Sequence, residues 1–147
     1  MFSFRLQSVL DFRKQVEDGH LAEFARVRRR LDHEMERLSR IMEDTMRMMN
    51  HLMMIGKGDI QPGDIALVKS YIKSLRELER RQQAVIETVK LELEDKRAEL
   101  LEAVKQRKIM ENLRERRFEA YKSEAQKREL KELDERGIIN AHKGDGR

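Results

Sequence analysis

The segment Gly56-Lys57-Gly58-Asp59-Ile60-Gln61-Pro62-Gly63-Asp64 decides the fold, because it is the one strong break between two long stretches of helical periodicity. It holds three glycines and the only proline of the chain. Glycine and proline together interrupt helices. Pro62 is tolerated in the first turn of a new helix, where Asp59 or Asp64 could act as a cap. The sequence therefore predicts one helix before this segment and a second helix after it.

The predicted organisation is a single hairpin over residues 1–136. Its first helix covers about residues 3–55, its turn residues 56–64, and its second helix about residues 65–136. The glycine-containing end, residues 137–147, is expected to be a disordered tail, because chain ends without packing partners fray.

Composition favours long helices over a compact globular core. Of the 147 residues 41% are charged and only 5% are aromatic. Such a chain must bury its apolar side chains along a narrow line, and two long paired helices do this with the fewest apolar residues. The predicted fold class is all-α, with two long helices in an antiparallel coiled-coil hairpin and the second helix overhanging.

Apolar residues before the turn recur with alternating steps of three and four, which is the heptad step of a coiled coil. The predicted seam of the first helix comprises Leu21, Phe24, Arg28, Leu31, Met35, Leu38, Met42, Thr45, Met49 and Leu52. A second stripe nearer the N-terminus comprises Phe2, Leu6, Val9, Arg13 and Val16. The two stripes differ in phase by one residue, which predicts a local skip near Gly19.

The same spacing continues after the turn. The predicted seam of the second helix comprises Ile65, Val68, Ile72, Leu75, Glu79, Gln82, Ile86, Val89, Leu93, Lys96, Leu100, Ala103, Arg107 and Met110. Glu79 and Gln82 interrupt it with a polar layer, of the kind that can fix register. In a hairpin closed near residue 60, we expect Glu79 to pair with Arg37 or Arg40.

The second helix is the longer one, so residues 118–136 have no predicted partner within the chain. At 1.5 Å per residue this overhang is roughly 28 Å long. It carries Phe118, Tyr121, Leu130 and Leu133. Because a lone helix of this length is marginal in water, the overhang and the start of the first helix are expected to form a docking surface.

No pattern in the sequence indicates catalysis. Two helices make no deep pocket, the four histidines lack the spacing of helical metal ligands, and cysteine is absent. We therefore expect no enzyme activity, catalytic residue, metal or other cofactor. The chain also lacks a signal peptide and an apolar run long enough to insert directly into a membrane, so a cytoplasmic location is expected.

Two local clusters bear on the partner. The basic run Arg26-Val27-Arg28-Arg29-Arg30 is followed at once by acidic residues, so a nucleic-acid partner is not expected. Methionines concentrate before the turn, and Met46, Met48, Met53 and Met54 are too spread around the helix for all to face one partner. Methionine surfaces adapt to varied partners, so a second interface is expected near the hairpin tip.

Several stretches resemble the FliJ family of flagellar, or type III, protein export proteins. They are Phe4-Arg5-Leu6-Gln7-Ser8-Val9-Leu10-Asp11-Phe12-Arg13-Lys14, Lys96-Arg97-Ala98-Glu99-Leu100-Leu101-Glu102-Ala103, Arg107-Lys108-Ile109-Met110-Glu111-Asn112-Leu113 and the closing Glu132-Leu133-Asp134-Glu135. Their order and spacing, with the length and single turn, cover nearly the whole chain.

The resemblance implies a coiled coil similar to the central shaft of rotary ATPases. It implies a protein of flagellum biogenesis, and hence of motility and chemotaxis, that is peripheral at the inner-membrane export apparatus. The implied partners are the flagellar export ATPase ring, whose assembly and activity it promotes, the cytoplasmic domain of the export gate, and export chaperones.

The resemblance also assigns partner-binding residues. ATPase binding maps to Arg5, Leu6, Arg13, Arg107, Lys108, Glu111, Leu113, Arg117 and Tyr121. Contact with the export gate maps to Met48, Tyr71, Leu75, Leu78 and Gln82.

Three other functions remain open from the sequence. They are the stalk protein of a virulence-type III secretion system, a shaft subunit of a rotary ion-translocating ATPase, and a basic coiled-coil nucleic-acid binder. Shaft subunits usually carry an added globular portion, which this sequence lacks. Duplex DNA binding with a steep salt dependence would support the last function.

Overall fold

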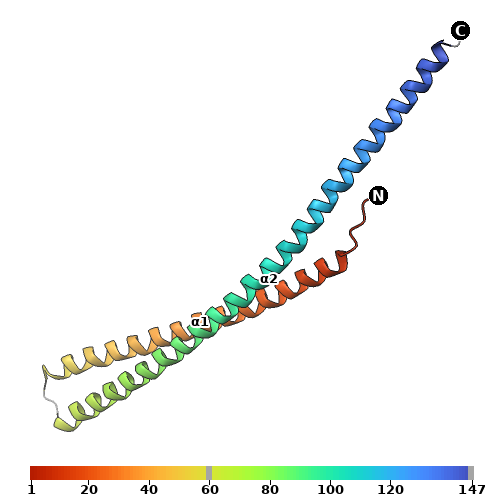
Figure 1. Cartoon of the computed structure of the whole chain (residues 1–147). Helices are drawn as coiled ribbons and strands as arrows, with labels where there is room; N and C mark the ends of the chain where they lie inside the picture. The colour runs from red at the N-terminus through yellow and green to blue at the C-terminus, as the bar shows by residue number, and fades with distance from the viewer. Residues whose placement is uncertain (59–60, 146–147) are drawn as a thin grey trace. The chain divides into compact units, whose positions relative to one another are not determined.

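A computed structural model describes residues 1–58 and 61–145, and it contains two long helices, α1 (Gln7–Ile55) and α2 (Pro62–Asp145) (Figure 1). The described residues include no strand. The prediction of an all-α hairpin of two long helices is confirmed. Within the described ranges, neither helix has a segment that is long and apolar enough to cross a membrane.

The turn lies where the glycines and proline predict it. After Ile55 the amide groups of Gly56 and Lys57 donate to the carbonyls of Leu52 and Met54 at 3.1 and 3.2 Å, which closes the last turn of α1. Helix α2 begins at Pro62, three residues earlier than expected, because a first helical position needs no amide donor. The cap expected at Asp59 lies outside the described residues.

Helix α1 begins later than expected, at Gln7 instead of residue 3. Residues 1–6 form a non-helical arm that ends in a turn, in which the Gln7 amide donates to the Phe4 carbonyl at 3.1 Å. The arm places its aromatic side chains against α2, as described below.

The end of α2 also differs from expectation. The helix continues to Asp145, whereas residues 137–147 were predicted to be a disordered tail. A single Gly137 weakens a helix without ending it, and His142 and Lys143 in the last turn complement the helix dipole. Residues 146 and 147 lie outside the described residues.

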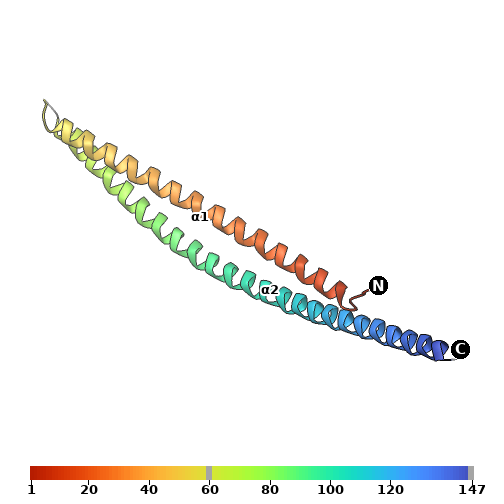
Figure 2. The same ribbon diagram turned by 90° about the horizontal axis from the view of Figure 1, so that it is seen from above.

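The structure divides into two compact units. Unit 1 consists of Met1–Asp18 with Glu102–Arg147, and unit 2 consists of Gly19–Leu101. In unit 2 the two helices run antiparallel and side by side from the turn, as both views show (Figures 1 and 2). Its core is a cluster of Val27, Leu31, Ile86 and Val89, against which Leu38 and Leu93 pack.

The predicted seam of α2 is confirmed. All fourteen of its positions from Ile65 to Met110 are buried or half-buried. The step of three and four therefore identified the face of α2 that meets α1 within each unit.

The predicted seam of α1 is half wrong. Its positions Phe24, Leu31, Leu38, Thr45 and Leu52 are buried or half-buried. At the alternate positions Leu21, Arg28, Met35 and Met42 are exposed, and the seam instead contains the residues one position earlier, His20, Val27, Glu34 and Ile41. Nearer the turn, Met48 and the predicted Met49 are both half-buried. Val27 is 0% exposed, whereas Leu21 is 51% exposed.

The stripe predicted near the N-terminus is right at Phe2, Leu6, Arg13 and Val16, which are half-buried, and wrong at Val9. Val9 is exposed and Leu10 is buried, with Arg13, Val16 and Glu17 half-buried. The buried and half-buried residues of α1 follow one unbroken pattern with alternating steps of three and four. Its first positions are Leu10, Arg13, Glu17, His20 and Phe24. The predicted skip near Gly19 is therefore wrong.

The polar layer of unit 2 has other partners than predicted. Gln82 is buried, and its Nε2 donates to the Glu34 backbone carbonyl at 2.9 Å and to Glu34 Oε2 at 2.5 Å. Arg40 pairs with Glu36 on its own helix at 3.2 Å. In the part of the chain that the structure describes, Glu79 forms no ion pair, so the predicted pairing with Arg37 or Arg40 is wrong.

Candidate functional site

The candidate site is the end of unit 1 where the N-terminal arm and the start of α1 meet the middle of α2. Leu10 of α1 is 1% exposed, and Phe4 of the arm is also buried. In Figure 2 this stretch of α1 runs beside α2 before α2 continues alone towards the C-terminus. The arm and α1 therefore supply one wall of the site and α2 supplies the other.

Aromatic side chains hold the arm on α2. The Phe2 ring lies 5.1 Å from the Phe118 ring and 5.5 Å from the Tyr121 ring, measured between centroids. Both geometries are tilted or edge-on, as aromatic pairs prefer. Phe118 and Tyr121 nevertheless remain 39% and 41% exposed, so each ring can contact a further partner.

Cationic side chains lie over the rings of Phe118 and Phe4. The Lys122 Nζ atom is 4.8 Å from the centre of the Phe118 ring, and the Arg117 Cζ atom is 6.0 Å from the centre of the Phe4 ring. A cation over a ring face is attracted by the ring quadrupole. The site therefore combines exposed aromatic and basic side chains, a composition enriched at the energetic centres of protein interfaces.

Unit 1 also contains a group of three charged residues, Arg107, Glu17 and Glu111. The Arg107 guanidinium donates to Glu17 across the helix pair and to Glu111 Oε2 on its own helix, the latter at 2.7 Å. The hydrogen bonds to Glu17 and to Glu111 raise the pKa of Arg107 above its usual value. Arg107 is half-buried, and its contacts with Glu17 and Glu111 link α1 to α2 within unit 1.

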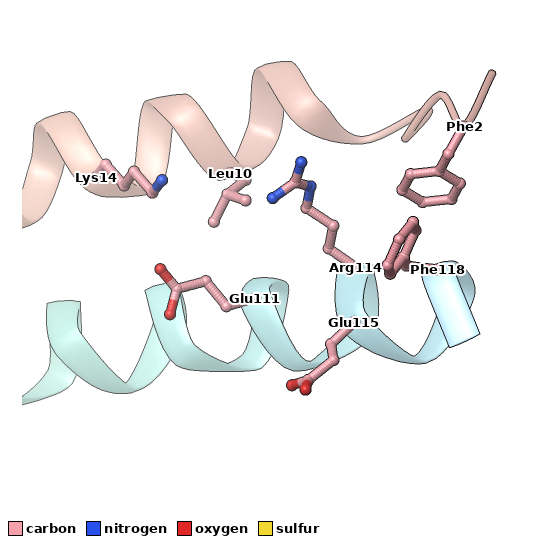
Figure 3. A pocket seen from close by; sticks show the side chains of 7 residues that line it. All are labelled: Phe2, Leu10, Lys14, Glu111, Arg114, Glu115 and Phe118. Atoms are coloured by element: carbon pink, nitrogen blue, oxygen red, sulfur yellow. The ribbon is translucent and has the colours of Figure 1, made fainter. Parts of the chain in front are cut away.

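A cavity of about 390 Å³ opens between the arm, α1 and α2. Figure 3 shows Leu10 and the Arg114 guanidinium reaching into it, with the Phe2 and Phe118 rings at one end. The Glu115 carboxylate points away on the other side of α2. The lining comprises Phe2, Leu10, Lys14, Glu111, Arg114, Glu115 and Phe118.

The unpaired part of α2 begins later than predicted. Phe118 and Tyr121 were expected in the overhang, but the Phe2 contacts place both in the paired part. All residues from 126 to 145 are exposed, including Leu130, Leu133, Ile138 and Ile139. This exposed segment is roughly 30 Å long at 1.5 Å per residue.

Unit 1 contains all nine residues that the resemblance assigns to ATPase binding. Arg5 and Leu6 lie in the arm, Arg13 lies in α1, and the other six lie in α2. Leu6, Arg13, Arg107, Glu111 and Leu113 are half-buried. Lys108, Arg117, Tyr121 and Arg5 are exposed and are therefore the members with most surface to offer a partner.

Unit 2 contains all five residues assigned to the export gate, but their exposure differs. Leu75 and Gln82 are buried in the seam against α1 and offer a partner little surface. Met48 is half-buried, whereas Tyr71 and Leu78 are exposed. Only Tyr71 and Leu78 of this set can make extensive contacts without opening the helix pair.

A row of exposed methionines on α1 adds to this surface. Met35, Met42, Met46 and Met53 lie beside the seam. A shallow groove on this face is lined by Ser39, Met42, Glu43, Met46 and Arg47. Of the four methionines expected to form a second interface near the turn, Met46, Met53 and Met54 are exposed and Met48 is half-buried, and the interface itself stays a prediction.

Sequence reasoning missed several contributors to the site in unit 1. Phe2 and Phe4 belong to the non-helical arm, whereas the sequence predicts a helix from about residue 3. Glu17 was missed because its partner, Arg107, is ninety positions away in the sequence. Lys14 and Arg114 lacked any local signal, since solvated helix faces carry the same residues.

Comparison with known proteins gives one match. The model of a protein family described as "Flagellar FliJ protein" matches residues 2–145. No curated protein matches the chain significantly, and no solved structure does.

Proposed function

Because this chain belongs to the FliJ family and thus has a role in flagellar protein export, we propose that it binds the flagellar export ATPase through unit 1 and promotes ring assembly and ATP hydrolysis. The observation that carries this proposal is the cluster of Phe2, Phe118, Tyr121 and Arg117, because exposed aromatic and arginine side chains are typical anchors of protein interfaces.

The exposed segment 126–145 extends this proposed interface. Its apolar side chains, among them Leu130 and Leu133, are more than half exposed. Acidic and basic side chains alternate with them along the helix, among them Glu129, Lys131 and Glu132. A ring of identical subunits can cover such a helix through several weak contacts, with charges setting orientation.

The proposal extends to the export gate and to export chaperones. The exposed residues Tyr71 and Leu78 on α2, and Met42 and Met46 on α1, offer apolar surface in unit 2. Methionine side chains adapt to different partners, which suits a protein that meets more than one. A cytoplasmic position at the inner-membrane export apparatus, without catalysis of its own, follows from these partners.

The matched family is described as flagellar, which favours the flagellar system over a virulence-type secretion system. The other two functions left open by the sequence, a rotary-ATPase shaft subunit and a nucleic-acid binder, gain no observation that favours them.

Binding of the purified ATPase tests the proposal. We expect Lys108→Glu and Arg117→Glu each to weaken binding several-fold without changing the unfolding temperature, because both side chains are exposed in unit 1. Arg29→Glu is the matched control, an exposed arginine of unit 2 that should leave binding unchanged. Equal losses in all three variants would point to nonspecific charge effects and would contradict an interface in unit 1.

A further inference from the structure

The cavity in unit 1 combines apolar walls with two available cations. The apolar walls are Phe2, Leu10 and Phe118. Lys14 and Arg114 also line it, and among the described residues neither has an ion-pair partner within 4 Å. Figure 3 shows the Arg114 guanidinium extending from α2 towards α1, in the space between Leu10 and Phe2.

The two carboxylates of the lining do not cancel these cations. Glu111 accepts a hydrogen bond from Arg107 at 2.7 Å, and Arg107 shares its single charge between Glu111 and Glu17. Glu115 points away from the cavity (Figure 3). Lys14 and Arg114 thus outnumber the one lining carboxylate that lies between the helices, so the net charge facing the open volume is positive. The rest of the lining is apolar.

We infer that this cavity binds an acidic peptide segment of the export ATPase, one in which a carboxylate stands next to a bulky apolar side chain. The apolar side chain occupies the space between Leu10, Phe2 and Phe118, and the carboxylate is held by Arg114 and Lys14. A guanidinium can grip a carboxylate through two parallel hydrogen bonds. This inference rests on the proposed function for the identity of the partner but not for the chemistry of the cavity.

The cavity volume suits such an occupant. About 390 Å³ lies at the lower end of the range for ligand sites in proteins, and it accommodates one or two side chains. One wall, Phe2, comes from the non-helical arm and contacts α2 through its two aromatic pairs. An apolar side chain that enters beside Phe118 would add to the same aromatic cluster.

A small probe tests the chemistry of the cavity without the ATPase. The full chain, labelled with nitrogen-15, is titrated with 4-phenylbutyrate and separately with the neutral 4-phenylbutyramide, and backbone amide shifts are followed by NMR. We expect the carboxylate to shift amides around residues 2–14 and 111–118 and to bind at least five-fold more tightly than the amide. Equal binding of both probes, or shifts elsewhere, would overturn the inference.

Variants then link the cavity to the partner. Arg114→Gln and Lys14→Gln should each weaken 4-phenylbutyrate and ATPase binding several-fold, whereas Arg29→Gln, at an exposed arginine of unit 2, should leave both unchanged. Unchanged ATPase binding by both cavity variants would overturn the assignment of the partner. If the wild-type chain does not bind the ATPase at all, the proposed function and the named partner fail, while the probe titration still decides the chemistry of the cavity.

Discussion

At the scale of single residues, burial distinguishes neighbours that look alike in the sequence. Ile41 and Met42 are both apolar and adjacent, yet Ile41 is 6% exposed and Met42 is 46% exposed. Both rows of α1 are apolar at most positions, so the pattern alone could not decide between them. The geometry of the opposing helix decides, because only one row can face α2.

This difference predicts unequal costs of truncation. Ile41→Ala should lower the free energy of unfolding by about 2–5 kcal/mol, the range for removing buried aliphatic groups. Met42→Ala, the matched control, should change it by less than about 0.5 kcal/mol, as exposed substitutions usually do. Urea unfolding followed by circular dichroism measures both. A larger loss in the methionine variant would restore the seam first predicted for α1.

Ion pairs across unit 2 predict a dependence of stability on pH. Glu23 lies 2.7 Å from Lys96, and the hydrogen bond and charge of Lys96 lower the pKa of Glu23 below its usual 4.5. A lowered pKa means that folding favours the ionised carboxylate, so its contribution is present above pH 4.5 and is lost as pH falls through the lower value.

We therefore expect wild-type stability to fall more steeply below pH 4.5 than that of Glu23→Gln. The effect should be small, because Glu23 is half exposed and solvent screens its charge. Unfolding temperatures measured at several pH values check this. Glu94→Gln, which removes an exposed carboxylate of α2, is the control. Identical pH slopes for Glu23→Gln and the wild type would contradict a stabilising role of the pair.

At the scale of elements, the sequence predicted α2 better than α1. The seam of α2 was identified at every position because apolar residues dominate only one face of that helix. The turn was identified because glycine and proline act locally. By contrast, the arm depends on contacts between Phe2 and residues more than a hundred positions away, which no local pattern encodes.

The exposed segment 126–145 at the end of α2 should contribute little to stability. Removing residues 126–147 should leave the unfolding temperature of the remaining chain within about 2 °C, because residues 126–145 are all exposed. The same truncation should weaken ATPase binding, since it removes the proposed extension of the interface. A marked fall in unfolding temperature would show instead that this segment packs on the hairpin.

The ion pairs of Arg107 make this residue a poor position for testing the interface. Reversing the charge of Arg107 would place three carboxylates together, since Glu17 and Glu111 both accept its hydrogen bonds. Such a variant would loosen α1 within unit 1 and would confuse folding with binding. Lys108, which is exposed and adjacent, is the cleaner position for testing the interface.

At the scale of the whole molecule, each unit has its own exposed apolar surface. Unit 1 carries the aromatic and basic cluster, and unit 2 carries the methionine row with Tyr71 and Leu78. The fold class and the family follow from heptads, one turn and short motifs distributed along the chain. The candidate site follows only from the structure, because the arm and distant parts of α2 form it together.

Two separate surfaces accord with a protein that connects two parts of an export apparatus. The proposed interface with the ATPase lies in one unit, and the surface proposed for the gate lies in the other. The central claim is that binding through unit 1 acts on the ATPase itself.

The most direct test is ATP hydrolysis by the flagellar export ATPase, with and without this protein, at concentrations where the ATPase alone is mostly monomeric. We predict clear stimulation together with ring formation, reduced by Lys108→Glu and retained with Arg29→Glu. Hydrolysis that stays at its basal rate, with no ring and no binding, would contradict the claim.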